Sequence, residues 1–398
     1  MDITITPKKL SGTIAAIPSK SQAHRHLICA AFSDRQTQIL CAATNRDIEA
    51  TVDCLNALGA TIQKTEYGYD VTPIVKVPTE AVLNCCESGS TLRFMLPIVG
   101  ALGVKGVFKT EGRLSQRPLS PLWEEMQRMG CHLSWETPNE LLCQGQLKTG
   151  TYTIAGNVSS QFISGLLFAL SLIPGKSQLD IVGKTESKPY IDMTKKALSA
   201  FSVDISKNEI SGSYPFHSPG RVQIEGDWSN GAFFLAAEKL GSALNITGLC
   251  EDSPQGDRAI QEILQQLTNY CTIDAADIPD LVPILSVFAA ANQGAVFTNV
   301  ARLRLKESDR VASVADMLNR FGIQTEYNEN TLTIYPGKFR GCTIDSFNDH
   351  RIAMSSAIAA TIADGEVTIL DAHCVNKSYP GFWEDYRTLG GSYEQYVR

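Results

Sequence analysis

The chain has 398 residues, of which 43% are hydrophobic and 19% charged, and its formal net charge at pH 7 is −7. This length predicts two or three domains with full cores, while the negative charge argues against a protein that coats nucleic acid. No apolar stretch approaches the roughly 18 to 20 residues of a membrane helix, the N-terminus lacks the apolar region of a signal peptide, and the eleven scattered cysteines indicate neither disulfides nor zinc. The sequence therefore predicts a globular cytoplasmic protein whose local cationic clusters bind small anions.

The first charged segment opens a predicted helix near residue 19. Lys20 and Arg25 lie about one turn apart at its start, and apolar residues continue its buried side from residue 27 onward. Unpaired backbone N–H groups and the positive dipole end make such a helix start a seat for anions. The alternative is that Ser19 or Ser21 caps the helix and that the charges are incidental.

Residues 87–93 repeat this form, because a turn of small residues with Gly89 leads into a helix start and Arg93. Glycine lets a ligand approach the backbone, and we expect a methyl group there to project into the space of that ligand. The Gly-Lys-Ser/Thr of a P-loop is missing. On the next loop, Arg113 and Arg117 offer guanidiniums that either bind carboxylate or phosphate or simply keep the loop solvated.

Neutral hydrogen-bonding groups mark two later helix starts. Ser159, Ser160 and Gln161 precede an uncharged helix with buried apolar spacing, and Ser187 and Tyr190 form a similar hydroxyl pair. These side chains suit a polyol or the oxygens of a phosphate. Capping by one serine is the alternative, although it leaves Gln161 unexplained.

Charged groups return in the second half of the chain. Residues 304–310 place three cations and two carboxylates before an amphipathic helix, among them Lys306, Glu307 and Arg310. An external anion would explain cations at a helix N-terminus. The alternative is a local cap, with Glu307 and Arg310 paired one turn apart.

Three further positions complete this pattern. Asp280 is a lone carboxylate before an apolar helix, where as an N-cap it would need no other function. Arg351 belongs to a cap-like segment, 348–351, that begins a helix of small residues, and Lys377 lies in the segment 376–380. The histidines show no metal-binding spacing, so we predict no metal site. Together these helix starts and loops predict a site for two multiply anionic small molecules.

A repeat in the chain predicts its architecture. Six amphipathic runs end in a small residue typical of helix ends. These residues are Gly59, Gly130, Ser202, Thr268, Gly322 and Gly390, at intervals of 71, 72, 66, 54 and 68. Such spacing fits six copies of a compact α/β unit, three in each of two domains, although helix ends can also look alike by chance. A loop with two prolines at 213–220 places the boundary near residue 225.

These residues, in this order, resemble the 5-enolpyruvylshikimate-3-phosphate synthases, the enolpyruvyl transferases of the shikimate pathway and the target of glyphosate. The similarity extends over essentially the whole chain. It implies a two-domain enolpyruvyl transferase fold, an inside-out α/β barrel in which each domain has three βαβαββ repeats. The domains would comprise residues 19–224, and residues 1–18 with 225–398, with the active site in the cleft between them.

The resemblance also implies a reaction without a cofactor, in which the enolpyruvyl group of phosphoenolpyruvate passes to the 5-hydroxyl of shikimate 3-phosphate. The catalytic residues would be Lys20, Asp280 and Glu307. Phosphoenolpyruvate would bind to Lys20, Gly89, Arg93, Arg113, Gln161, Arg310, Arg351 and Lys377. Shikimate 3-phosphate would bind to Lys20, Ser21, Arg25, Ser159, Ser160, Gln161, Ser187, Tyr190, Asp280 and Lys306.

Three positions depart from common family residues. Glu87 stands where asparagine is frequent, Ser90 where threonine is frequent, and Phe94 where proline is frequent. The related enolpyruvyl transferases that act on UDP-N-acetylglucosamine carry a cysteine where this chain has Gly112, which argues against that activity. We expect a monomer that binds neither nucleic acid nor membranes, and Arg302 remains unassigned.

Overall fold

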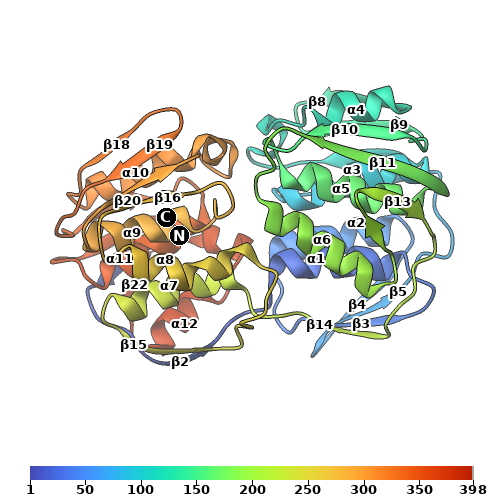
Figure 1. The fold of residues 1–398 in the computed structure, drawn as a ribbon. Coiled ribbons are helices and arrows are strands. Elements are labelled where there is room, and N and C mark those ends of the chain that lie inside the picture. Colours follow the sequence, from blue (N-terminus) through green and yellow to red (C-terminus); the bar gives the residue numbers. More distant parts are fainter. Residues whose placement is uncertain (397–398) are drawn as a thin grey trace. The chain divides into compact units, whose positions relative to one another are not determined.

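The computed structural model describes residues 1–396 of the chain. Contacts within it define two compact units (Figure 1): unit 1 contains Met1–Ile17 and Glu225–Arg398, and unit 2 contains Pro18–Ile224. Both units mix helices and strands in the repeating order that the helix ends predicted. None of the helices within residues 1–396 combines the length and hydrophobicity that a membrane crossing requires.

Unit 2 contains three copies of a helix-covered, four-stranded mixed sheet. The first copy comprises α1 (Lys20–Ala31), β3 (Thr37–Leu40), α2 (Arg46–Ala57), β4 (Thr61–Thr65), β5 (Gly68–Thr72) and the late strand β14 (Arg221–Gln223). The second comprises β6 (Glu80–Asn84), α3 (Gly89–Leu102), β7 (Lys105–Lys109), η1 (Leu114–Gln116), α4 (Leu122–Arg128), β8 (Cys131–Thr137) and β9 (Glu140–Gly145). The third comprises β10 (Thr151–Ala155), α5 (Ser160–Leu172), β11 (Gly175–Val182), α6 (Lys188–Ala200), β12 (Ile205–Ser206) and β13 (Glu209–Gly212). Each sheet joins a parallel strand pair to an antiparallel hairpin, as in the order β6-β7-β9-β8.

Unit 1 contains two further four-stranded copies and one reduced copy. The reduced copy comprises β2 (Ser11–Ala15), α7 (Trp228–Lys239), β15 (Ala243–Thr247), η2 (Gly256–Ala259) and α8 (Ile260–Gln266). The next comprises β16 (Cys271–Asp274), α9 (Val282–Ala291), β17 (Ala295–Thr298), η3 (Ala301–Leu305), α10 (Arg310–Arg320), β18 (Thr325–Tyr327) and β19 (Thr331–Ile334). The last comprises β20 (Cys342–Asp345), α11 (His350–Ala360), β21 (Val367–Leu370), η4 (Ala372–Lys377), α12 (Phe382–Thr388), β22 (Ser392–Tyr396) and the first strand of the chain, β1 (Asp2–Thr6). β1 lies between β21 and β22, and pairs antiparallel with both.

The reduced copy explains the one short interval in the sequence repeat. Its sheet has only β2 and β15, which pair in parallel. Residues 267–270 alone separate α8 from β16, so no hairpin of two strands follows this helix. The interval of 54 residues before Gly322 lacks the length of that hairpin, whereas the other intervals include it.

The predicted helix ends are confirmed where the backbone turns into the left-handed region. Gly59, Gly130, Gly322 and Gly390 have φ values of 105°, 114°, 86° and 86°, and Ser202 has 61°. Glycine reaches these angles without steric penalty, which is why it ends most of these helices.

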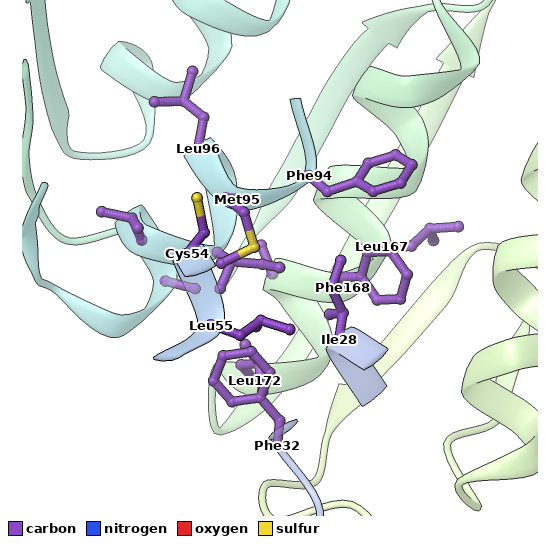
Figure 2. Close-up of a cluster of buried hydrophobic side chains, with 14 of the residues drawn as sticks. Ile28, Phe32, Cys54, Leu55, Phe94, Met95, Leu96, Leu167, Phe168 and Leu172 are labelled. Carbon is purple, nitrogen blue, oxygen red and sulfur yellow. The ribbon is translucent and has the colours of Figure 1, made fainter. Parts of the chain in front are cut away.

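The buried helices α3 and α5 pack closely against each other in the core of unit 2. Figure 2 shows part of this core, in which Phe94 of α3 meets Phe168 of α5 with ring centroids 5.7 Å apart. Gly165 permits this close packing, because a Cβ atom there would lie 2.3 Å from the carbonyl oxygen of Arg93. The starts of α3 and α5 are thereby held next to each other.

Candidate functional site

Arg25 is a buried cation fixed by several hydrogen bonds in unit 2. Its Nε donates to Thr194 Oγ1 at 2.7 Å, and its Nη atoms donate to the carbonyl oxygens of Ser21 at 2.7 Å and Tyr190 at 3.0 Å. The guanidinium also lies 5.0 Å from the ring centroid of Phe94. Burial lowers the pKa of Arg25 to about 10, so it still carries its charge at neutral pH.

Arg93 and Gln161 form a second fixed pair. Arg93 Nη1 donates to Gln161 Oε1 at 2.7 Å, and Gln161 Nε2 donates to Ser90 Oγ at 2.9 Å. Arg93 Nη2 also donates to the carbonyl oxygen of Pro118 at 3.2 Å. The side chain of Gln161, which capping alone did not explain, therefore orients a guanidinium at the start of α3.

Arg117, rather than Arg113, lies against the Gly89 turn. A Cβ atom on Gly89 would lie 2.6 Å from Arg117 Nη1 and 3.0 Å from its Cζ. The space beside Gly89 that we expected to belong to a ligand is thus occupied by this guanidinium. Arg113 is exposed and precedes η1, and a Cβ atom on Gly112 would meet the carboxylate of Glu87 at 2.7 Å.

Lys20 is held by a carboxylate from a neighbouring helix. Its Nζ lies 2.9 Å from Asp47 Oδ2, in the first turn of α2. Ser19 precedes α1 without a side-chain capping bond, so the capping alternative fails there. Ser159 does cap α5 by accepting from Gln161 N at 3.3 Å, while Ser187 precedes α6 without a capping bond.

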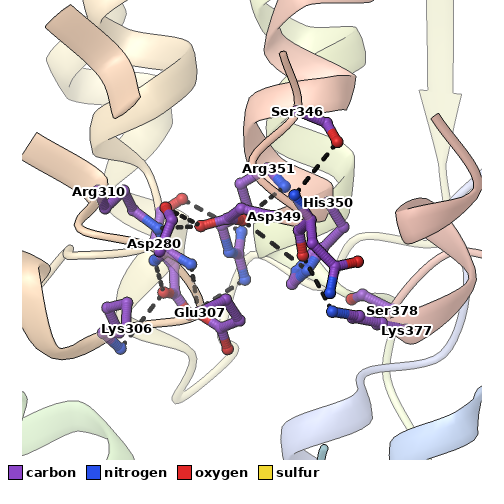
Figure 3. A network of polar contacts seen from close by, with 12 residues as sticks. Asp280, Lys306, Glu307, Arg310, Ser346, Asp349, His350, Arg351, Lys377 and Ser378 are labelled. Carbon is purple, nitrogen blue, oxygen red and sulfur yellow. Dashed lines mark hydrogen bonds and ion pairs between the residues drawn. The ribbon is translucent and has the colours of Figure 1, made fainter. Parts of the chain in front are cut away.

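Unit 1 contains a dense ionic network around Arg310 (Figure 3). The buried Arg310 guanidinium contacts three carboxylates: Asp280 at 2.8 Å, Glu307 at 2.6 Å and Asp349 at 3.1 Å. Burial alone would lower its pKa, but the three carboxylates outweigh that effect and raise it. Arg310 therefore keeps its charge in any physiological condition.

Asp280 is not an N-cap, which removes the simplest alternative for it. α9 begins after Leu281 without a side-chain capping bond. Asp280 instead accepts from Arg310 Nη1 at 2.8 Å and Arg351 Nη2 at 3.0 Å, and lies 3.5 Å from Lys306 Nζ. Burial alone would raise the pKa of Asp280, but these three cations hold it well below its ordinary value.

The remaining predicted cations of unit 1 lie at helix ends. Burial lowers the pKa of Lys306 to about 8, so a fraction of this amine is neutral near physiological pH. Lys377 ends η4 and donates to the carbonyl oxygen of Asn348 at 2.9 Å. Among residues 1–396, no group of three or more His, Cys, Asp or Glu side chains is placed to hold a metal ion.

Two further carboxylates, one within this network and one near it, were not among the predicted site residues. Asp349 caps α11 through Arg351 N at 3.0 Å and also accepts from Ser308 Oγ at 3.1 Å, so it joins the starts of α10 and α11. Asp257 of η2 is buried beside Ser229 Oγ, and burial together with the charge of Asp280 raises its pKa to about 7. Asp349 was visible in the sequence as a cap, whereas no sequence signal marks Asp257.

Each unit thus presents preorganised cations and hydrogen-bonding groups at helix starts, an arrangement suited to phosphate and carboxylate groups. In unit 1 these cations face carboxylates that can exchange protons. Such a combination supports chemistry in which charge builds up on oxygen and protons move between substrates and side chains.

Comparisons with known proteins agree with this chemistry. A family model described as EPSP synthase (3-phosphoshikimate 1-carboxyvinyltransferase) matches residues 5–277 and 268–386. The proteins named 3-phosphoshikimate 1-carboxyvinyltransferase from Clostridium kluyveri and Clostridium perfringens (strain ATCC 13124) are 37% and 39% identical to this chain, over 99% and 98% of it and 98% of each relative.

Solved structures give the same result for the fold. An EPSP synthase from Acinetobacter baumannii is 25% identical and superposes with a TM-score of 0.80, covering 99% of this chain and 100% of that one. The enolpyruvyl transferase NikO from Streptomyces tendae has a TM-score of 0.76 at 17% identity, covering 100% of this chain and 99% of its own, and so supports the fold alone. The predicted α/β enolpyruvyl transferase fold is confirmed by these similarities.

Proposed function

The chain belongs to the EPSP synthase family, and on this premise we propose that it transfers the enolpyruvyl group of phosphoenolpyruvate to the 5-hydroxyl of shikimate 3-phosphate, releasing phosphate. Apart from family membership, the main observation that supports this proposal is the ionic network around Arg310. It places buried guanidiniums next to Asp280 and Glu307. Anion-binding groups and proton-transfer groups therefore lie within direct contact of one another.

We propose that phosphoenolpyruvate binds to cations at helix ends and on loops of both units. Its site would comprise Lys20, Gly89, Arg93, Arg113, Gln161, Arg310, Arg351 and Lys377, together with Arg117. Support for adding Arg117 comes from its position at the Gly89 turn, where the N-terminus of α3 also favours an anion. Gln161 would fix the direction of the Arg93 guanidinium.

Shikimate 3-phosphate would bind to the set richer in hydroxyl groups. Its site would comprise Lys20, Ser21, Arg25, Ser159, Ser160, Gln161, Ser187, Tyr190, Asp280 and Lys306. The rigid hydrogen bonding of Arg25 supports a role in holding a phosphate group, because a preorganised guanidinium loses little freedom on binding. We further propose that both units contribute to one active site and that a monomer is sufficient for activity.

The reaction would proceed by addition and then elimination. A proton adds to C3 of phosphoenolpyruvate, the 5-hydroxyl oxygen bonds to C2, and the hydroxyl proton passes to a base. In the second stage C3 loses a proton, the double bond forms again, and the bond from C2 to the phosphate oxygen breaks. Asp280 would accept the hydroxyl proton, while Glu307, with Lys20, would carry the proton of C3.

Substrate anions would activate the base. In the structure Asp280 faces three cations that lower its pKa, so alone it is a weak base. Phosphoenolpyruvate would draw Arg310 and Arg351 toward its own phosphate and carboxylate. This exchange would raise the pKa of Asp280 only when phosphoenolpyruvate, the molecule that the 5-hydroxyl attacks, is in place.

A phosphate-release assay with both substrates tests this function. We expect release from phosphoenolpyruvate to require shikimate 3-phosphate and to be absent with UDP-N-acetylglucosamine. Turnover with the nucleotide sugar alone, or loss of all activity with a chelator, would contradict the proposal. Light scattering of the active sample would test the monomer, and the free thiols of all eleven cysteines fit the proposed cytoplasmic location.

A further inference from the structure

A chain of buried polar side chains connects three helices in unit 2, α1, α2 and the start of α3. His24 Nδ1 of α1 lies 2.7 Å from Thr51 Oγ1 of α2, and Thr51 Oγ1 lies 2.7 Å from Thr91 Oγ1 of α3. Thr91 Oγ1 in turn lies 2.7 Å from Ser88 Oγ. All four side chains are buried, so their hydrogen bonds are protected from competition with water.

This chain ends at two segments of the proposed phosphoenolpyruvate site. Thr91 Oγ1 lies 3.3 Å from the carbonyl oxygen of Asp47, the residue whose carboxylate holds Lys20 Nζ at 2.9 Å. Ser88, at the other branch, caps α3 immediately before Gly89 by accepting from Thr91 N at 3.3 Å. One hydroxyl group therefore contacts both the residue that orients the lysine and the residue that forms the glycine turn.

The chain has a preferred direction. Burial, with smaller effects from Lys20 and Arg25, lowers the pKa of His24 well below its ordinary value, so the imidazole is neutral. Within residues 1–396 its buried Nε2 has no hydrogen-bond partner, which favours the tautomer with hydrogen on Nδ1. His24 then donates to Thr51, Thr51 donates to Thr91, and the Thr91 hydrogen is directed at Ser88 or Asp47.

We infer that Thr51 and Thr91 are positioning residues that hold Lys20 and the Gly89 turn in register for phosphoenolpyruvate. The inference rests on the proposed function and adds to it two residues that touch neither substrate. Because the chain is buried and continuous, removing the Thr91 hydroxyl leaves the Thr51 donor without an acceptor and releases Asp47 and Ser88 from each other. The shikimate 3-phosphate residue Arg25 is held by separate bonds, to Thr194, Ser21 and Tyr190.

Replacement of the hydroxyl by a methyl group tests the inference. Thr91→Val keeps the shape of the side chain, and we expect it to raise the Michaelis constant for phosphoenolpyruvate about 3- to 10-fold, the scale of one lost hydrogen bond. The constant for shikimate 3-phosphate should rise less, because Lys20 is the one disturbed residue of the ten proposed to bind it, whereas phosphoenolpyruvate loses both Lys20 and the Gly89 turn. Thr91→Ser, which keeps the hydroxyl, should restore normal values. If Thr91→Val loses its native circular dichroism, Thr51→Val serves as the test, because it removes the donor that directs the Thr91 hydroxyl toward Ser88 and Asp47.

A matched control separates positioning from stability. Thr37, the first residue of β3, has another buried hydroxyl in unit 2, which lies 2.6 Å from Ser218 Oγ. Thr37→Val should lower the melting temperature without changing either Michaelis constant. Equal rises in both constants in Thr91→Val, or unchanged kinetics, would overturn the inference. An inactive wild-type protein would instead refute the proposed function, so the two failures are distinguishable.

Discussion

The contact between Gly89 and Arg117 allows a sharp test of the anion site. In Gly89→Ala, the new methyl carbon would lie 2.6 Å from Arg117 Nη1. Ordinary contact begins near 3.4 Å, so the guanidinium must move by about 0.8 Å. Since Nη1 is the far end of a flexible side chain, the side chain can move without disturbing the backbone.

The expected loss is therefore in activity and not in stability. Misplacement of a binding group by about 1 Å can lower activity by about 10²-fold, and we expect Gly89→Ala to lower kcat/KM for phosphoenolpyruvate by up to that factor. Gly89 is the first residue of α3 and its φ is not positive, so the backbone there accepts alanine without strain. The melting temperature should thus remain unchanged or rise slightly.

A double-mutant cycle decides whether the methyl group acts through Arg117. If it does, Gly89→Ala should have almost no further effect in the Arg117→Ala background, which gives a coupling free energy of up to about 2.7 kcal/mol. Gly381→Ala is the control, because Gly381 lies at a helix start, as the residue immediately before α12, and its methyl carbon would meet nothing closer than 3.7 Å. Additive effects of the two substitutions would refute this reasoning. They would indicate that the methyl group acts on the ligand directly, as the sequence predicted.

Three other predictions concern the ionic network and the two units. Glu307→Gln should lower turnover by about 10²- to 10⁴-fold if Glu307 carries a proton. Asp316→Asn, which removes an exposed ion pair with Arg320 in the same helix, should leave turnover unchanged. Normal turnover of Glu307→Gln with a lowered melting temperature would mean that Glu307 stabilises the fold, as in its ion pair with Arg310, and carries no proton. Asp257 has a folded-state pKa of about 7, raised from 3.8, so its contribution to stability is present below about pH 4 and lost as the pH rises through 7. The melting temperature of Asp257→Asn relative to wild type should therefore be higher at pH 8 than at pH 5, and a difference independent of pH would contradict the assignment. Saturating shikimate 3-phosphate should reduce the radius of gyration in small-angle scattering if both units bind it, and an unchanged radius would count against a shared site.

The sequence predicted the repeated architecture because each copy ends a helix in the same way. Gly59, Gly130, Gly322 and Gly390 all require the left-handed backbone that favours glycine. The reduced copy was not predicted, although its interval of 54 residues was visible. A short interval can result from a missing hairpin or from a shorter loop, and the sequence does not distinguish these two causes. The sheet formed by β2 and β15, which has no hairpin added to it, shows that the hairpin is missing.

The sequence predicted which types of residue form the candidate site more reliably than it predicted which residues contact each other. Helix starts with cations are visible in the sequence, but Arg113 and Arg117 lie on one loop and carry the same charge. The short helix η1 between them leaves Arg113 exposed and brings Arg117 against Gly89, a difference that no periodic pattern in the sequence encodes. Asp257 was missed for a similar reason, because its significance comes from burial near Asp280, far away in the sequence.

The pairing of carboxylates with cations in unit 1 has a consequence for how the proposed site would work. Breaking a buried ion pair by removing one partner is strongly unfavourable, because the remaining charge loses its compensation. Arg310 can leave Asp280 only if another anion takes its place, and the substrate would supply that anion. Asp349 and its bond to Arg310 Nε would keep the guanidinium in position during this exchange. Binding and activation of the base would then be one event, so that proton transfer is confined to the occupied site.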